Sequence, residues 1–158
     1  MKRPKHAAHT PPGAAITELI LETFRLNGLL LEAGDRLVAD IDLTSARWQV
    51  LGAIALAPVP LPVAHLARNM GLSRQAVQRL ANEMERDGLV RFAPNPHHER
   101  AKLVMLTAAG ERAFAAAAAR QAPWANALAK ELSAERIEDA RALLRALRER
   151  LVPRFRSS

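Results

Sequence analysis

The stretch of residues 63–80 constrains the fold most strongly, because its spacing predicts two short helices joined by a tight turn. Ala67 is small enough for two helices to cross closely, and Gly71 tolerates the positive φ that such a turn requires. Ser73 is a good N-cap for a second helix over 74–87. Apolar residues are spaced to hold that helix against the first, namely Leu66, Met70, Leu72, Val77 and Leu80. The stretch therefore predicts a helix-turn-helix.

The outer face of the second helix carries polar and basic side chains that suit a DNA major groove. Arginine pairs with guanine and glutamine with adenine through two hydrogen bonds, and serine and arginine also bind phosphate. The candidate DNA-binding residues are Ser73, Arg74, Gln75, Gln78 and Arg79. Glu83, Glu85 and Asp87 follow and would be repelled by phosphate, so we expect the N-terminal part of the helix to enter the groove. The alternative is a solvated polar face on an ordinary helical hairpin.

Two β-rich runs within 89–106 predict a hairpin, or wing, whose long polar tip directly follows the helix-turn-helix. Arg100 is predicted to enter the adjacent minor groove, where the negative potential favours arginine, and Lys102 to contact phosphate. The alternative for Arg100 is a salt bridge with Glu99 or Glu111.

The wing tip also holds two adjacent histidines, His97 and His98. Neighbouring side chains point in different directions on an extended chain, and no third ligand lies nearby in the sequence. We therefore expect no metal site there. His98 would gain a proton, and with it affinity for phosphate, only at low pH.

Helical periodicity continues on both sides of this winged helix-turn-helix, which occupies about residues 44–106. Residues 14–40 and 107–152 predict long helices whose apolar faces are economically buried against a second copy of the chain. Residues 1–13 are basic and proline-containing, and predict a disordered arm. The predicted fold is thus mostly α with a small β-hairpin wing, in one domain over 14–158.

Glycine and proline residues predict where the helices bend or end. Gly28 and Gly34 weaken the first helix and predict a bend. Pro58 ends the helix that precedes the helix-turn-helix, and Pro123 predicts a kink or interruption in the Ala-rich helix after the wing. Ser133 is a suitable cap for the last helix.

The composition excludes several classes of function. The net charge of +7 favours polyanionic partners such as double-stranded DNA. The absence of cysteine removes disulfides, thiolate nucleophiles, cysteine-based zinc sites and thiol redox sensing. The sequence shows neither a secretory signal nor a membrane-spanning run, so we expect a cytoplasmic protein with no membrane partner. It contains no catalytic or cofactor-binding motif, so we expect neither an enzyme nor a cofactor.

The order and spacing of five stretches resemble the MarR family over about residues 16–152. These stretches are 43–51, 66–73, 77–80, 87–90 and 106–110. The resemblance implies a homodimer held by the flanking helices, with the helix over 74–87 in the major groove and the wing in the minor groove of a pseudo-palindrome. One position departs from the family pattern. His98 stands where the wing usually has an aspartate that helps to orient its arginine, here Arg100.

The resemblance further implies a pocket between the dimerisation helices and the winged domain for a small aromatic or anionic effector. This would place Phe24, Arg47, Trp48 and Phe114 near that effector. For Trp48, packing in the core is the alternative. The resulting interpretation is a sequence-specific, ligand-responsive repressor. The alternative is an architectural module without sequence preference, which would show a strong salt dependence and no preferred site.

Overall fold

The computed structural model describes residues 8–152 of the chain. Residues 1–7, which form most of the predicted basic arm, and residues 153–158 lie outside the described part. The chain divides into two compact units, one ending at Arg120 and the other beginning at Gln121. In the described residues no helix is long and apolar enough to cross a bilayer.

The first helix, α1 (Pro11–Val38), begins within the segment that we predicted to be a disordered arm. The reason is local: Thr10 caps the helix by accepting a hydrogen bond from the Gly13 amide, and proline is well tolerated in a first turn. The helix is unbroken through Gly28 and Gly34. A short 3₁₀ turn, η1 (Ala39–Ile41), follows it.

Three helices of the first unit form the predicted helix-turn-helix and its support: α2 (Ser45–Ala55), α3 (Val63–Met70) and α4 (Arg74–Arg86). Gly71 has the predicted positive φ of 67° at the turn, and Gly88 has a φ of 75° after the end of α4. The prediction for Leu72 was wrong. Its side chain is 42% exposed, because only its backbone amide turns inward, to the Ala67 carbonyl.

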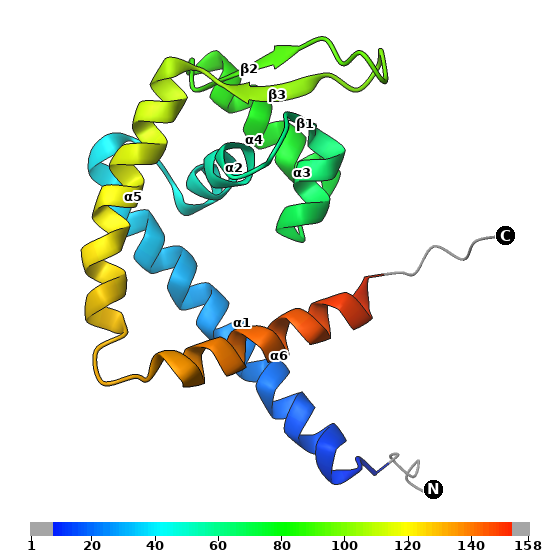
Figure 1. The fold of residues 1–158 in the computed structure, drawn as a ribbon, viewed down its shortest axis with the longest axis vertical. Coiled ribbons are helices and arrows are strands. Elements are labelled where there is room, and N and C mark those ends of the chain that lie inside the picture. Colours follow the sequence, from blue (N-terminus) through cyan, green and yellow to red (C-terminus); the bar gives the residue numbers. More distant parts are fainter. Residues whose placement is uncertain (1–7, 153–158) are drawn as a thin grey trace, which may run out of the picture. The chain divides into compact units, whose positions relative to one another are not determined.

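The sheet has three strands in the order β1-β3-β2, one more than the predicted hairpin (Figure 1). The hairpin strands are β2 (Val90–Ala93) and β3 (Leu103–Leu106). The additional strand, β1 (Leu61–Pro62), pairs antiparallel with β3. The proline-rich segment after α2 is already extended, and an edge position suits it because proline cannot donate a ladder hydrogen bond.

One core joins these elements. Its fully buried side chains come from all five helices α1 to α5 and from the strands, and include Val38, Val50, Leu51, Leu66, Val77, Met84, Val90, Val104 and Ala117. Ala67 is 3% exposed, as expected of the small residue where α3 and α4 approach. Trp48 and Phe114 are partly buried against this core.

A hydrogen-bonded corner closes the base of the wing. The Thr107 hydroxyl donates to the Gly88 carbonyl at 2.6 Å and accepts from the Gly110 amide at 3.1 Å. A Cβ atom on Gly110 would lie 2.0 Å from the Leu89 carbonyl oxygen, so this approach requires glycine. The end of α4, the wing and the start of α5 (Ala108–Leu128) therefore meet at Thr107.

Of the two outcomes predicted for Pro123, an interruption is wrong, because α5 continues to Leu128. A kink at Pro123 stays a prediction. Proline removes one amide donor, but α5 resumes its pattern beyond it, with the Ala129 amide donating to the Ala125 carbonyl. The Ala-rich residues before Pro123 have the highest helix propensity and favour this continuation. The last helix, α6 (Ala134–Leu151), is capped by Ser133 as predicted.

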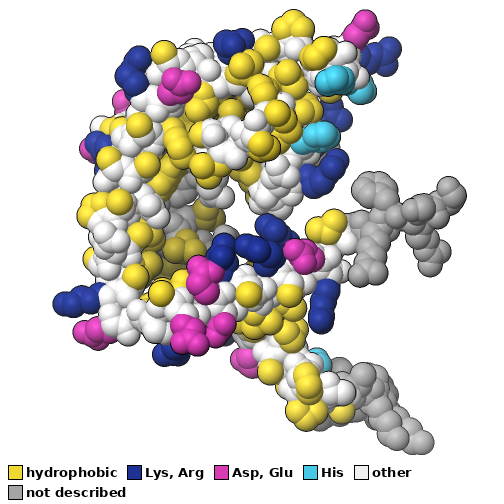
Figure 2. Space-filling model, in the orientation of Figure 1, with side chains coloured by type: hydrophobic (Ala, Val, Ile, Leu, Met, Phe, Trp, Pro, Cys, Tyr) yellow, Lys and Arg dark blue, Asp and Glu magenta, His cyan; other side chains and the backbone are white. Residues whose placement is uncertain are grey.

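Two helices leave large apolar side chains exposed, and yellow apolar atoms lie open on the surface in Figure 2. On α1 these are Ile20, Leu21, Phe24, Leu26, Leu29, Leu30 and Leu31, and on α6 they are Ile137, Leu143, Leu144 and Leu151. Several large apolar side chains exposed on one helix are typical of an association interface.

Two residues, Ser45 and Arg120, hold the C-terminal part of α1 and the turn η1 by polar contacts. The buried Ser45 hydroxyl donates to the Leu31 carbonyl at 2.8 Å, and the Ser45 amide donates to Asp35 at 2.6 Å. Arg120 binds both carboxylate oxygens of Asp40, and this hydrogen bonding lowers the pKa of Asp40 below its ordinary value.

Gly34→Ala should destabilise the protein, because the added Cβ would lie 2.0 Å from the Ser45 hydroxyl oxygen. We expect a loss of about 1–3 kcal/mol in the free energy of unfolding, from steric strain and the disrupted hydrogen bond. Chemical denaturation at fixed protein concentration measures it. Gly28→Ala is the matched control: it meets nothing within 4 Å and should be neutral or slightly stabilising. Equal effects of the two substitutions would contradict the close approach.

The contact between Asp40 and Arg120 should contribute a pH-dependent part of the stability. Since the folded pKa of Asp40 is lowered, its contribution is complete above roughly pH 4 and is lost as the pH falls through the folded pKa. NMR titration of the Asp40 carboxyl carbon should show its pKa rising in Arg120→Gln but not in Arg112→Gln, an exposed control on α5. An unchanged pKa in Arg120→Gln would contradict the assignment.

Candidate nucleic-acid interface

The amphipathic sequence of α4 orients the predicted DNA-binding residues. Its inner side chains, Val77, Leu80, Ala81 and Met84, are buried in the core. The opposite face is therefore fixed toward solvent, because a helix turns 100° per residue. Ser73 caps α4 by accepting from the Ala76 amide at 3.1 Å, which leaves its hydroxyl hydrogen available for a phosphate oxygen.

The outer face of α4 forms an open groove lined by Arg74, Gln75, Gln78, Arg79, Asn82, Glu85 and Arg86. Four of the five residues predicted on this helix face lie in it. Side chains within it are already ordered by one another: the Gln78 amide donates to Asn82 Oδ1 at 2.9 Å, and Arg79 Nη1 lies 3.3 Å from Glu83 Oε1.

Residues of α4 and of the wing line a second groove together. Its polar and basic lining includes Arg74 and Gln78 from α4, and Arg100 and Lys102 from the wing. These residues are separated by more than twenty positions in the sequence, yet the fold places them around one concave surface. The structure thus joins the helix residues and the wing residues that were predicted separately.

Asn95 organises the wing tip. Its side-chain amide donates to the Ala101 carbonyl at 2.8 Å, and its carbonyl oxygen accepts from the His97 amide at 3.0 Å. The alternative of a salt bridge from Arg100 to Glu99 or Glu111 is not seen among residues 8–152. The described part of the chain likewise contains no cluster of three potential metal-binding side chains around the histidines.

Asn82 and Arg86 were not predicted, yet they lie in the groove beside the predicted residues. A helical repeat could have identified both. Asn82 follows Gln78 by four positions, and Arg86 follows Asn82 by four more. They were left out because the acidic residues nearby suggested that only the first half of α4 would approach DNA.

The four residues predicted near an effector lie in different environments. Phe24 is 69% exposed on α1, whereas Trp48 and Phe114 pack on the core. Arg47 projects from α2 to the acidic residues of α4, where Nη1 lies 2.7 Å from Asp87 Oδ2. None of the four lines the grooves beside α4.

Comparisons with known proteins agree with this architecture. Residues 41–101 match the family model described as MarR family. A Mycobacterium tuberculosis protein, Rv2011c, is 34% identical over 132 residues, which cover 84% of this chain and 91% of the relative. The Rhodopseudomonas palustris transcriptional activatory protein BadR is 34% identical over 98 residues, covering 61% of this chain and 56% of BadR.

Solved structures provide the same fold. The M. tuberculosis transcriptional regulator MosR, solved in complex with DNA, aligns with a TM-score of 0.69 at 27% identity, covering 85% of this chain and 98% of MosR. CouR from Rhodococcus jostii RHA1, solved with p-coumaroyl-CoA, aligns with a TM-score of 0.72 at 24% identity, covering 83% and 90%. The winged helix-turn-helix, the basic grooves beside α4 and these similarities together show that the chain is a DNA-binding transcription regulator, not an enzyme, and that it belongs to the MarR family.

Proposed function

We propose that the protein is a sequence-specific repressor that acts as a homodimer on a pseudo-palindromic operator. The observation that carries the proposal is the groove shared by α4 and the wing, where Arg74, Gln78, Arg100 and Lys102 converge. The amide and guanidinium groups of α4 supply base-reading hydrogen bonds in a major groove. The basic groups of the wing suit the narrower minor groove beside it.

The exposed apolar faces of α1 and α6 support the homodimer. Large apolar side chains such as Phe24 on α1 and Leu144 on α6 are unfavourable in water, and a second copy supplies a matching apolar surface. A two-fold axis would then present two copies of α4 to half-sites about one helical turn apart.

Release by a small aromatic or anionic effector is the remaining part of the proposal. CouR, a similar fold, was solved with p-coumaroyl-CoA, which supports effector binding within this architecture. Trp48, Phe114 and Phe24 remain the candidate aromatic residues, with Arg47 as a candidate cation. The name of BadR describes an activator, so a reporter assay must distinguish repression from activation.

We also propose a cytoplasmic location, because the proposed partner is DNA. Among residues 8–152 no helix could span a membrane.

The sequence specificity is tested by selecting from random DNA duplexes with the purified protein at near-physiological salt. We expect an enriched inverted repeat. On that site, Arg79→Ala and Arg100→Ala should each weaken binding about tenfold or more, because each removes a charged donor that contacts DNA. Arg112→Ala on α5, which lies outside both grooves, is the matched control. Binding with no enriched motif would support the architectural alternative, and unchanged affinity in both variants would contradict the groove assignment.

The homodimer is tested by analytical ultracentrifugation of a chain that ends at Leu132 and so lacks α6. We expect monomer or aggregate, because the exposed apolar side chains of α6 are part of the proposed interface with the second copy. The matched control ends at Val152 and keeps α6 complete, and it should remain a dimer. A stable dimer without α6 would place the interface elsewhere.

A further inference from the structure

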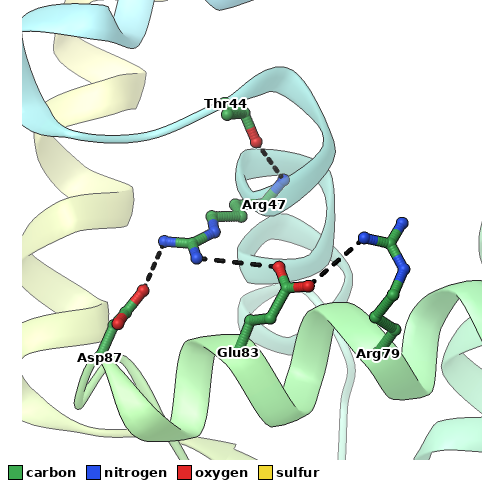
Figure 3. A network of polar contacts seen from close by, with 5 residues as sticks. All are labelled: Thr44, Arg47, Arg79, Glu83 and Asp87. Carbon is green, nitrogen blue, oxygen red and sulfur yellow. Dashed lines mark hydrogen bonds and ion pairs between the residues drawn. The ribbon is translucent and has the colours of Figure 1, made fainter.

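A charged network links α2 to the second half of α4 (Figure 3). Arg47, which follows the capping residue Thr44 on α2, lies at its centre. Its Nη1 is 2.7 Å from Asp87 Oδ2, and its Nη2 is 3.8 Å from Glu83 Oε2. The other oxygen of Glu83, Oε1, lies 3.3 Å from Arg79 Nη1. Two arginines from two helices thus share one carboxylate.

The members of the network differ in exposure. The Arg47 and Glu83 side chains are only 21% and 28% exposed, whereas Arg79 is 70% exposed. The partly buried pair is less screened by solvent than an ordinary surface pair. Arg47 and Glu83 are therefore the partly buried members of the network, and Arg79 is its solvent-facing end.

Glu83 and Asp87 would otherwise oppose DNA binding. Glu83 lies on α4, the helix proposed to face DNA, and Asp87 caps the end of that helix. An unpaired acid near phosphate is repelled. Arg47 approaches the helix from α2, outside the two grooves beside α4, so it balances these acids without occupying the surface that DNA would use.

Glu83 also holds Arg79 through one nitrogen only. Within residues 8–152, Arg79 makes no hydrogen bond through its other guanidinium nitrogens. Those nitrogens retain the paired N–H groups that bind a guanine edge. Because Arg47 engages the opposite oxygen of Glu83, it keeps this carboxylate in place behind Arg79.

We propose that Arg47 is a positioning residue for DNA recognition: by occupying Glu83 and Asp87, it removes their repulsion of phosphate and fixes the carboxylate that orients Arg79. The residue has this role in addition to, or in place of, the effector contact considered for it above. The inference rests on the proposed DNA-binding role of α4.

The experiment measures affinity for the selected DNA site at fixed salt. Arg47→Gln should weaken binding about tenfold, which is the change that corresponds to a net loss of about one charge-assisted contact. If the inference is correct, this loss of affinity depends on the carboxylates of Glu83 and Asp87. In a Glu83→Gln/Asp87→Asn background, adding Arg47→Gln should therefore cost less than about twofold, since no unpaired carboxylate is left behind. Glutamine at position 83 still offers an oxygen to Arg79.

Two controls separate positioning from stability. Arg36→Gln removes the same charge from an exposed pair with Glu32 on α1 and should leave the affinity unchanged. Thermal unfolding and circular dichroism show that each variant is folded at the assay temperature. A second selection with Arg47→Gln should show relaxed preference at the base pair where Arg79→Ala also relaxes it, which a purely structural role would not produce.

The outcomes are distinct. An unchanged affinity in Arg47→Gln, or an equal loss with and without the two acids, would overturn the inference while leaving the proposed function intact. If Arg79→Ala and Arg100→Ala both leave the affinity unchanged, the proposed function itself fails. A loss in Arg47→Gln that disappears in the neutralised background supports both.

Discussion

The apolar contact between α4 and the helices beneath it determines the rest of the structure. Val77, Ala81 and Met84 are completely buried against side chains such as Leu51 and Leu66. Burial of this kind contributes roughly 1.5–3 kcal/mol for each large side chain, and it permits only one rotation of the helix about its axis. The polar face of α4 is consequently held toward solvent. The packing of the inner face in the core thus fixes the direction in which the charged side chains of the outer face point.

The sequence allowed the helix-turn-helix to be predicted because its determinants are local. Ala67, Gly71 and Ser73 each act through neighbours within a few residues, and the structure places each as expected. The groove that Arg74 and Arg100 share was not predicted, because the helix and the wing were considered separately and meet only in the folded chain. The roles of these residues in binding DNA remain predictions.

The features that were missed depend on distant partners. The strand β1 exists because Leu61 pairs with Val104, more than forty residues later, and a two-residue strand has no periodicity of its own. Arg47 was placed near an effector by the family resemblance alone. Its acidic partners lie more than thirty residues further along the sequence, so their proximity to Arg47 appears only in the folded chain. Leu72 was misassigned because a turn residue can be held by its amide while its side chain faces water.

The corner at Thr107 has a mechanical consequence. One hydroxyl binds the carbonyl that ends the turn after α4 and also caps the first turn of α5, while Gly110 packs directly on the Leu89 carbonyl at the root of the wing. Both α4 and the wing are therefore attached to the N-terminal end of α5. A tilt of α5 would therefore move α4 and the wing together as one rigid body. Their orientation would change, but the distance between α4 and the wing would not.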